Sequence, residues 1–162
     1  MADNFSIAWR LVESQHSRSA FSGHGGLLAS ARFSTIGKKA LYLASSPSLA
    51  ALETRGFLGS TAVKKEFALF QVKIPSELSM VTLAVRDLPK HWDASPPQAE
   101  TRKIGDDFIS ARRALMLRVP SVHLPLAAYE HDCNFLVNPE HPDFIKLIIG
   151  KPIEFYFDQR LK

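Results

Sequence analysis

The stretch KALYLASSPSLAALETRGF, residues 39–57, predicts a strand that passes directly into a capped helix. Its first part is apolar and rich in strand-forming residues. Ser46 followed by Pro47 is a combination typical of a helix start, with the serine as N-cap and the proline at the first helical position. We expect the helix to end near Gly56–Gly59, because glycine favours helix termination.

Glu53 is the most informative residue of this predicted helix. It lies four residues after Leu49 and four before Phe57, so helical spacing places its carboxylate along an apolar stripe. A carboxylate that faces inward loses water and requires a partner. Two interpretations stay open: a glutamate at the edge of the stripe that turns to water, or an acid that lines a pocket.

Short predicted strands surround this unit on both sides. They lie at 5–11, 27–34, 39–45, 66–75, 80–85, 116–120, 122–125, 135–138 and 153–158, with further helices at 105–115 and 141–147. The order shows no regular βαβ alternation, which favours an α+β fold over a doubly wound sheet. We expect a single compact domain over residues 1–162, built from short mixed β-strands and a few helices.

Composition indicates an ordinary globular protein, with 46% hydrophobic and 22% charged residues. No apolar run reaches the length of a membrane helix, which is about 18–20 residues. The first residues lack a basic segment followed by an apolar core, so we expect no secretory signal. The single cysteine, Cys133, fits a reducing compartment, and we expect a cytoplasmic protein.

The net charge of +4 lies entirely in the first half of the chain. No Asp or Glu occurs between Glu13 and Glu53, whereas the same stretch contains glycines, serines and cations. Its Lys and Arg residues are Arg18, Arg32, Lys38 and Lys39. Cations, hydroxyls and glycine N–H groups suit an anionic ligand. A solvated basic loop, a nucleic-acid surface and a site for a small phosphorylated ligand all remain open.

Three further residues are candidates for a site. Arg32, in the predicted strand 27–34, could present its planar guanidinium to a phosphate, or it could simply face outward. Tyr42 stands in the strand 39–45, where a core aromatic with a bonded hydroxyl is an equally ordinary role. Ser121 follows Pro120, which fixes its hydroxyl, although turn chemistry alone also explains a serine there.

A metal site is not indicated. Four possible ligands fall close together, namely His123, His131, Cys133 and His141, but their spacing matches no zinc pattern. The glycine-rich phosphate loops of nucleotide-binding folds are also absent from the sequence. We therefore expect no metal.

Taken together, these residues resemble the RES family, toxins of bacterial toxin–antitoxin pairs that are named for an Arg, a Glu and a Ser. The likeness extends over about residues 5–158. Its motifs are Trp9-Arg10, FSGHGG (21–26), Arg32, Gly37, LYLA (41–44), SPSLAALE (46–53), LPKHW (88–92), GDDF (105–108), LRVPSVHLP (117–125) and NFLVNPEHPDF (134–144). The chain departs from the family at residues 30–34, where Ser-Ala-Arg-Phe-Ser replaces the usual Gly-Gly-Arg-Trp-Asn.

The resemblance implies a fold similar to the ADP-ribosyltransferases of the diphtheria-toxin type, which use NAD. It also implies a toxin that cleaves the nicotinamide–ribose bond of NAD and so depletes the cell of it. NAD is then the substrate, and inorganic phosphate or water is the second reactant. On this basis Glu53, Arg32 and Tyr42 are the expected catalytic residues, and Arg32, Tyr42, Ser121 and Asn134 the expected NAD contacts.

The resemblance further implies an antitoxin partner with a helix-turn-helix domain of the Xre type, which covers the pocket and binds the operator. DNA would then be contacted only through the antitoxin. A homo-oligomer is compatible with the family, and no membrane partner is expected. Two other classes of function stay open: a mono-ADP-ribosyltransferase that modifies a protein, and a non-enzymatic basic binding module.

Overall fold

Strands β1 (Phe5–Glu13) and β3 (Phe67–Pro75) form the longest strand pair of the computed structural model, which describes residues 4–161. They run antiparallel, with Phe5 opposite Pro75 and Glu13 opposite Phe67. Both faces of this pair are packed, because Val72 and Ile74 belong to one core cluster and Phe67 and Leu69 belong to another. Ala8 and Val72, which face each other across this pair, are fully buried.

The remaining strands extend this pair into a mixed sheet with the order β4-β5-β6-β2-β1-β3-β7. Strand β8 also pairs with β3, at residues 67–69, whereas β7 pairs with it at residues 72–73. Their bounds are β2 (Leu41–Ala44), β4 (Met80–Thr82), β5 (Met116–Val119), β6 (Asn134–Val137), β7 (Ile148–Ile149) and β8 (Ile153–Phe155). All neighbours run antiparallel except β4 and β5.

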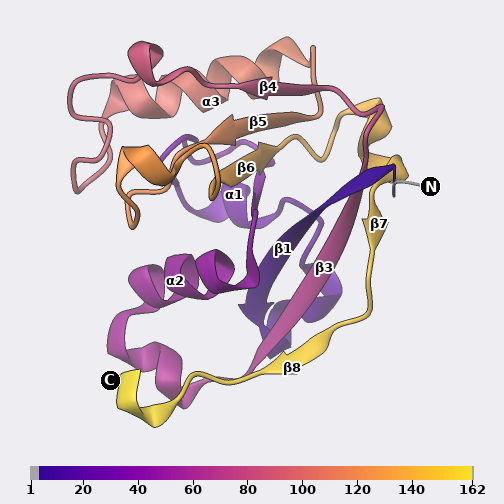
Figure 1. The fold of residues 1–162 in the computed structure, drawn as a ribbon, viewed down its shortest axis with the longest axis vertical. Helices are drawn as coiled ribbons and strands as arrows, with labels where there is room; N and C mark the ends of the chain where they lie inside the picture. The colour runs from indigo at the N-terminus through magenta and orange to yellow at the C-terminus, as the bar shows by residue number, and fades with distance from the viewer. Residues whose placement is uncertain (1–3, 162) are drawn as a thin grey trace.

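The sheet has a seam between β1 and β2. These two strands share a single register pair, Trp9 with Ala44, whereas β2 pairs with β6 along its whole length. Figure 1 shows the result: β4, β5 and β6 lie with helix α3 in the upper part, and β1, β3 and β8 lie in the lower part beside α2. The candidate site lies where the two parts meet.

Three α-helices connect the strands: α1 (Gly25–Leu28), α2 (Pro47–Leu58) and α3 (Ala99–Ala111). Short 3-10 segments cover Ser14–Ser19, Gly59–Lys64, Val85–Asp87, Leu126–Ala128, Pro142–Lys146 and Gln159–Leu161. The prediction for α2 is confirmed at both ends. The Ser46 hydroxyl accepts the N–H of Leu49 at 3.1 Å, and Gly59 follows the last turn with φ of +58°.

The predicted strand at 27–34 is wrong. Residues 25–28 form a helical turn, and the Ala31 N–H then donates to the Ser34 carbonyl at 2.8 Å to close a tight turn. Tertiary contacts decide this, because Phe33 is buried beneath α3 and stacks against Trp92.

Three other predicted elements also differ. Helix α3 begins at Ala99 instead of residue 105, residues 122–125 contain a turn instead of a strand, and residues 142–146 form a 3-10 segment instead of an α-helix. The observed mixed sheet with a few helices, folded as one compact domain, nevertheless confirms the α+β prediction.

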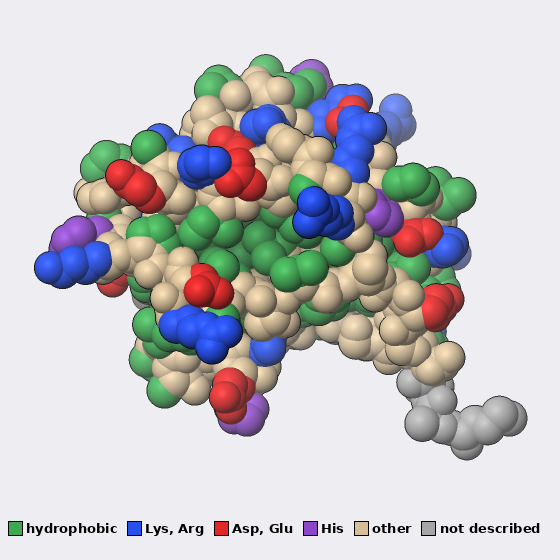
Figure 2. Space-filling view, turned by 90° about the horizontal axis from the view of Figure 1, so that it is seen from above, with side chains coloured by type: hydrophobic (Ala, Val, Ile, Leu, Met, Phe, Trp, Pro, Cys, Tyr) green, Lys and Arg blue, Asp and Glu red, His purple; other side chains and the backbone are tan. Residues whose placement is uncertain are grey.

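Exposed apolar residues remain at the β4 edge of the sheet, where Met80, Val81 and Val85 stay accessible. Figure 2 views the molecule from above, on the side of α3 and β4, and shows apolar side chains gathered in the middle of this face with charged groups around them. None of the helices formed by residues 4–161 is long and apolar enough to cross a membrane.

Candidate functional site

The start of helix α2 is tied to the start of strand β6. Ala44, the last residue of β2, lies opposite Asn134, the first residue of β6. Two residues before Asn134, the Asp132 carboxylate accepts hydrogen bonds from the hydroxyls of Ser45 and Ser46. The serine that caps α2 is therefore also anchored to the β6 segment, which fixes the direction in which the helix leaves the sheet.

This anchoring brings Glu53 to Asn134, although 81 residues separate the two. Glu53 Oε1 accepts the Asn134 side-chain N–H at 2.5 Å and the Ser121 hydroxyl at 2.7 Å. Its other oxygen, Oε2, lies 3.5 Å from His123 Nε2. About a third of the Glu53 side chain, 34%, is exposed. The carboxylate therefore has directed partners, and the interpretation of a glutamate turned to water is wrong.

The apolar stripe predicted along α2, from which Glu53 was inferred to face inward, is only partly buried in the structure. Leu49 is buried, but Leu52 is 39% exposed and Phe57 is 83% exposed. The buried face of α2 is centred on Leu49 and Ala50, close to the helix start. Glu53 lies one turn after that face, at the border between the core and solvent.

Ser121 combines the two roles considered for it. Strand β5 ends at Val119, and Pro120 prevents the ladder from continuing. The Ser121 oxygen accepts the backbone N–H of His123 at 3.1 Å, as in an ordinary serine turn, while its hydroxyl donates to Glu53. The side chain is almost fully buried, at 3% exposure.

Arg32 lies in the tight turn at 31–34 instead of a strand. Its Nη1 donates to the carbonyls of Trp92 and Ala94, at 2.8 and 2.9 Å. Within residues 4–161, its Nε and Nη2 groups have no hydrogen-bond partner. Burial lowers the pKa of Arg32, and the carboxylates of Glu53 and Asp93 act in the opposite direction. The guanidinium stays charged at neutral pH and offers its remaining donors to an anion.

Tyr42, on β2, has its hydroxyl 3.2 Å from the Ser34 hydroxyl. Burial raises the pKa of Tyr42 to about 12, and the negative charge of Glu53 acts in the same direction. The phenol is thus neutral at physiological pH. Its backbone carbonyl accepts Arg10 Nη1 at 2.8 Å, so Arg10 of the Trp9-Arg10 motif supports the strand that carries Tyr42. Burial lowers the pKa of Arg10 to about 10.

The other cations of the acid-free stretch lie apart from Arg32. Lys38 Nζ donates to the Ser110 hydroxyl at 3.0 Å, and Lys39 Nζ lies 3.6 Å from Glu140. With Arg112 these side chains line a cavity of about 330 Å³ near the end of α3. The positive charge of the first half is therefore divided between at least two places.

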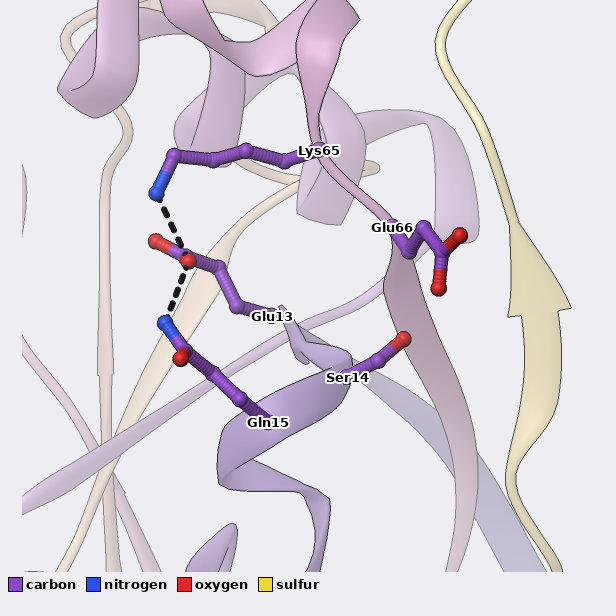
Figure 3. A pocket seen from close by; sticks show the side chains of 5 residues that line it. All are labelled: Glu13, Ser14, Gln15, Lys65 and Glu66. Carbon is purple, nitrogen blue, oxygen red and sulfur yellow. Dashed lines mark hydrogen bonds and ion pairs between the residues drawn. The ribbon is translucent and has the colours of Figure 1, made fainter.

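A second cavity, of about 300 Å³, lies at the end of β1. Figure 3 shows Glu13 bound by two of the lining side chains: it accepts from Lys65 at 2.7 Å and from Gln15 at 2.9 Å. The hydrogen bond from Lys65 lowers the pKa of Glu13. Neither of the two cavities is lined by Glu53 or its partners.

The possible metal ligands of the sequence do not come together. Among residues 4–161, no group of three or more His, Cys, Asp and Glu side chains is placed to hold a metal ion. His123 instead contacts Glu53, and the Cys133 sulfur accepts Arg118 Nε at 3.0 Å. Burial raises the pKa of the Cys133 thiol.

His123 is the site residue that the sequence reasoning missed, because it was considered only as a metal ligand. A signal for it exists in Gly56, which stands inside α2 one turn after Glu53. A Cβ at Gly56 would lie under 3.0 Å from the His123 ring. A glycine in a helix interior costs stability, so its presence beside a candidate acid indicates close approach by another group.

Comparison with known proteins matches this chain to one family. The RES domain family model matches residues 7–158. A Yersinia enterocolitica protein named Toxin Res is 34% identical over 96% of this chain and 99% of its own length. A Sphingobium protein named Prs ADP-ribosylating toxin is 30% identical over 94% of each chain.

A solved structure shows the same fold. The structure of the M. tuberculosis MbcT–MbcA toxin–antitoxin complex matches 94% of this chain and 85% of its own, with a TM-score of 0.75 at 13% identity. The mixed α+β fold of this chain is thus shared with a chain of that complex. With a family model that covers nearly the whole chain and a relative of matching length, the chain belongs to the RES domain family.

Proposed function

We propose that this chain is the toxin of a toxin–antitoxin pair and that it cleaves the nicotinamide–ribose bond of NAD. The observation that carries the proposal is the Glu53 carboxylate, half-buried at the seam of the sheet and held by Ser121 and Asn134. Family membership supports it, since the relatives matched are named toxins. In this proposal the whole chain acts as one NAD-cleaving domain.

The chemistry requires a single carboxylate. When the bond between ribose C1″ and the pyridinium nitrogen breaks, its electron pair passes to the nitrogen, and nicotinamide leaves as a neutral molecule without acid catalysis. The ribose carbon gains oxocarbenium character, as in glycoside hydrolysis. The Glu53 carboxylate, partly shielded from water, stabilises that positive charge or fixes the ribose hydroxyls.

Arg32 and Tyr42 are proposed to bind the substrate. The Nη1 of Arg32 is occupied by the two carbonyls of the 92–94 segment, which leaves Nε and Nη2 to bind the pyrophosphate. Tyr42, neutral and held by Ser34, offers the face of its ring to the nicotinamide or its ribose.

Ser121 and Asn134 hold the acid in place in this mechanism. Both donate to the same oxygen of Glu53, so the hydroxyl proton of Ser121 is already committed before NAD binds. The Asn134 amide oxygen is an additional acceptor for the substrate. Fixed donors of this kind keep the carboxylate oriented before the reaction begins.

The second reactant supplies the oxygen atom that replaces nicotinamide at C1″. A lone pair of an oxygen forms the new bond to C1″: inorganic phosphate yields ADP-ribose 1″-phosphate, and water yields ADP-ribose with release of a proton. The experiment is NAD consumption by the purified chain with and without phosphate, with the products resolved by chromatography and ³¹P NMR. Release of nicotinamide with either ADP-ribose product supports the proposal, and an unchanged NAD pool refutes it.

Glu53→Ala is the matched variant for this assay. It should abolish NAD loss while the circular dichroism spectrum and melting temperature stay close to those of the wild type, because about a third of the side chain is exposed. Full turnover in this variant would remove Glu53 from the mechanism.

The relative named Prs ADP-ribosylating toxin favours a second candidate, transfer of ADP-ribose to a protein. The same carboxylate serves this reaction, since only the attacking group differs. Incubation of a cell lysate with NAD labelled in its adenylate part distinguishes the two functions. Label that stays on a protein after denaturation favours transfer, and label found only in small molecules favours hydrolysis or phosphorolysis.

We further propose a helix-turn-helix antitoxin of the Xre type as the partner, with both proteins in the cytoplasm, where the NAD pool lies. The matched solved structure, a toxin–antitoxin complex, supports an antitoxin partner. Co-expression of the chain with a helix-turn-helix protein encoded beside it should restore growth and yield a complex on purification. Operator binding by the chain alone would contradict the proposal that DNA is contacted through the antitoxin.

A further inference from the structure

His123 is the one neighbour of Glu53 to which no role has yet been given. It lies in the turn after β5, where its backbone N–H bonds to the Ser121 oxygen at 3.1 Å. This bond fixes the start of the side chain relative to Ser121. The imidazole then extends across helix α2, and Nε2 lies 3.5 Å from Glu53 Oε2.

Gly56 makes this position possible. A Cβ at residue 56 would lie under 3.0 Å from both Cε1 and Nε2 of the imidazole, a separation that real Cβ atoms essentially never show. Any other residue at 56 would move the ring away from the helix and away from Glu53. After the first turn of the helix, its weakest helix-forming residue therefore stands where the imidazole lies against it.

The partners of Glu53 are divided between its two oxygens. Ser121 and Asn134 both donate to Oε1, and His123 is the group beside Oε2. A carboxylate bound through one oxygen can still swing its other oxygen about that anchor. A donor at the second oxygen removes this freedom and fixes the plane of the group.

We propose that His123 is a positioning residue for Glu53, whose Nε2–H holds Oε2 and so sets the plane of the carboxylate for the reacting ribose. The inference rests on the proposed NAD cleavage, which it deepens. Since the bond acts on the orientation of the acid and not on substrate binding, its loss lowers kcat more than it changes KM. Misplacement of a reacting group by about 1 Å costs on the order of 100-fold in rate, which sets the upper limit of the effect.

The first test compares two substitutions of His123. His123→Val removes the donor and should lower kcat about 10-fold or more, with KM changed less than about twofold. His123→Gln places an amide N–H where Nε2 was and should recover kcat to within about threefold of the wild type. His16→Val, at an exposed histidine of the first 3-10 segment, is the control and should leave both constants unchanged.

The second test uses Gly56. Gly56→Ala displaces the ring and should lower kcat as His123→Val does, although alanine ordinarily stabilises a helix interior. Phe57→Ala is the matched control on the same helix, since that side chain is 83% exposed. In the His123→Val background, Gly56→Ala should cost nothing further, because the ring that it displaces is gone.

A third measurement does not depend on turnover. The ¹⁵N shifts of the His123 ring at about pH 9, where imidazole side chains are neutral, report which nitrogen carries the proton. The Nε2–H form should dominate in the wild type and lose this preference in Glu53→Ala. A wild type that leaves NAD intact refutes the proposed function, whereas the ring shifts still test the contact between His123 and Glu53.

Three results would overturn the inference. The first is His123→Val with wild-type kcat, and the second is His123→Gln as slow as His123→Val, which would exclude the N–H donor. The third is a ring tautomer that does not respond to Glu53→Ala. The expected pattern, with loss in His123→Val, recovery in His123→Gln and no additional loss in the double variant, supports it.

Discussion

Substitution of Gly105 tests how the turn that carries Arg32 is held. A Cβ at Gly105 would lie far inside 3.0 Å of the Phe33 carbonyl oxygen and 2.7 Å from Leu136 Cδ2. One neighbour is backbone and the other is fully buried, so neither can move aside easily. Helix α3 and the 31–34 turn must separate by more than about 1 Å in Gly105→Ala.

The size of the effect follows from two opposing contributions. Overpacking of this kind costs about 1–3 kcal/mol, and the gain in helix propensity returns about 0.5–1 kcal/mol. The midpoints of the two ranges leave a net loss in the free energy of unfolding of about 1.25 kcal/mol. For a domain of this size, that lowers the melting temperature by about 2.5–5 °C.

Thermal and urea unfolding of Gly105→Ala and Gly56→Ala provide the assay. Gly56→Ala displaces a partly exposed imidazole, which can swing into solvent, so it should be as stable as the wild type or more stable. Gly105→Ala should also raise the KM for NAD, since the turn that it displaces carries Arg32. A Gly105→Ala chain as stable as the wild type would refute the close contact between α3 and this turn.

Three further predictions concern single side chains. Arg32→Lys should raise the KM for NAD about 10-fold with a smaller effect on kcat, because a point charge replaces a planar donor, and an unchanged KM in steady-state kinetics would contradict the phosphate role. Asn134→Ala should lower kcat about 10-fold or more by removing one of the donors to Glu53, and wild-type turnover would show that Ser121 suffices. Lys65 lowers the pKa of Glu13 below its ordinary value of 4.5. The ion pair therefore stabilises the fold fully above pH 4.5, and this stabilisation is lost as the pH falls through the lower pKa of the folded state. Urea unfolding from about pH 6 to 3 should therefore show a smaller acid-induced loss for Glu13→Gln than for the wild type, and parallel curves would contradict the assignment.

The parts of the fold that the sequence predicted well are those that local chemistry decides. Ser46, Pro47 and Gly59 determine the ends of α2 by capping and backbone preference, without help from the rest of the chain. The sequence pattern predicts the start of helix α3 too late, because the first turn of the helix is polar and shows no apolar periodicity. The Arg32 turn was read as a strand because its conformation depends on Phe33 lying beneath α3, a contact between distant segments.

In the candidate site, too, local sequence patterns identify some residues, whereas contacts between distant segments decide the others. Glu53 was found from its spacing to Leu49, although the stripe fails at Phe57, which is exposed. Ser121 and Asn134 were assigned by family resemblance, since nothing in their own neighbourhood indicates that they meet at one oxygen. His123 was missed because its partner lies on another element, and only the glycine at 56 marks the place where the two segments touch.

The bond between Asn134 and Glu53 spans 81 residues, and this separation has a consequence for synthesis. The ribosome makes Glu53 early, together with the helix that carries it, but Ser121 and Asn134 follow only in the last third of the chain. Until β6 has left the ribosome, the acid lacks at least the Asn134 donor on Oε1, and the nascent protein has no assembled centre. Whatever depends on this centre can therefore begin only after most of the chain has been synthesised.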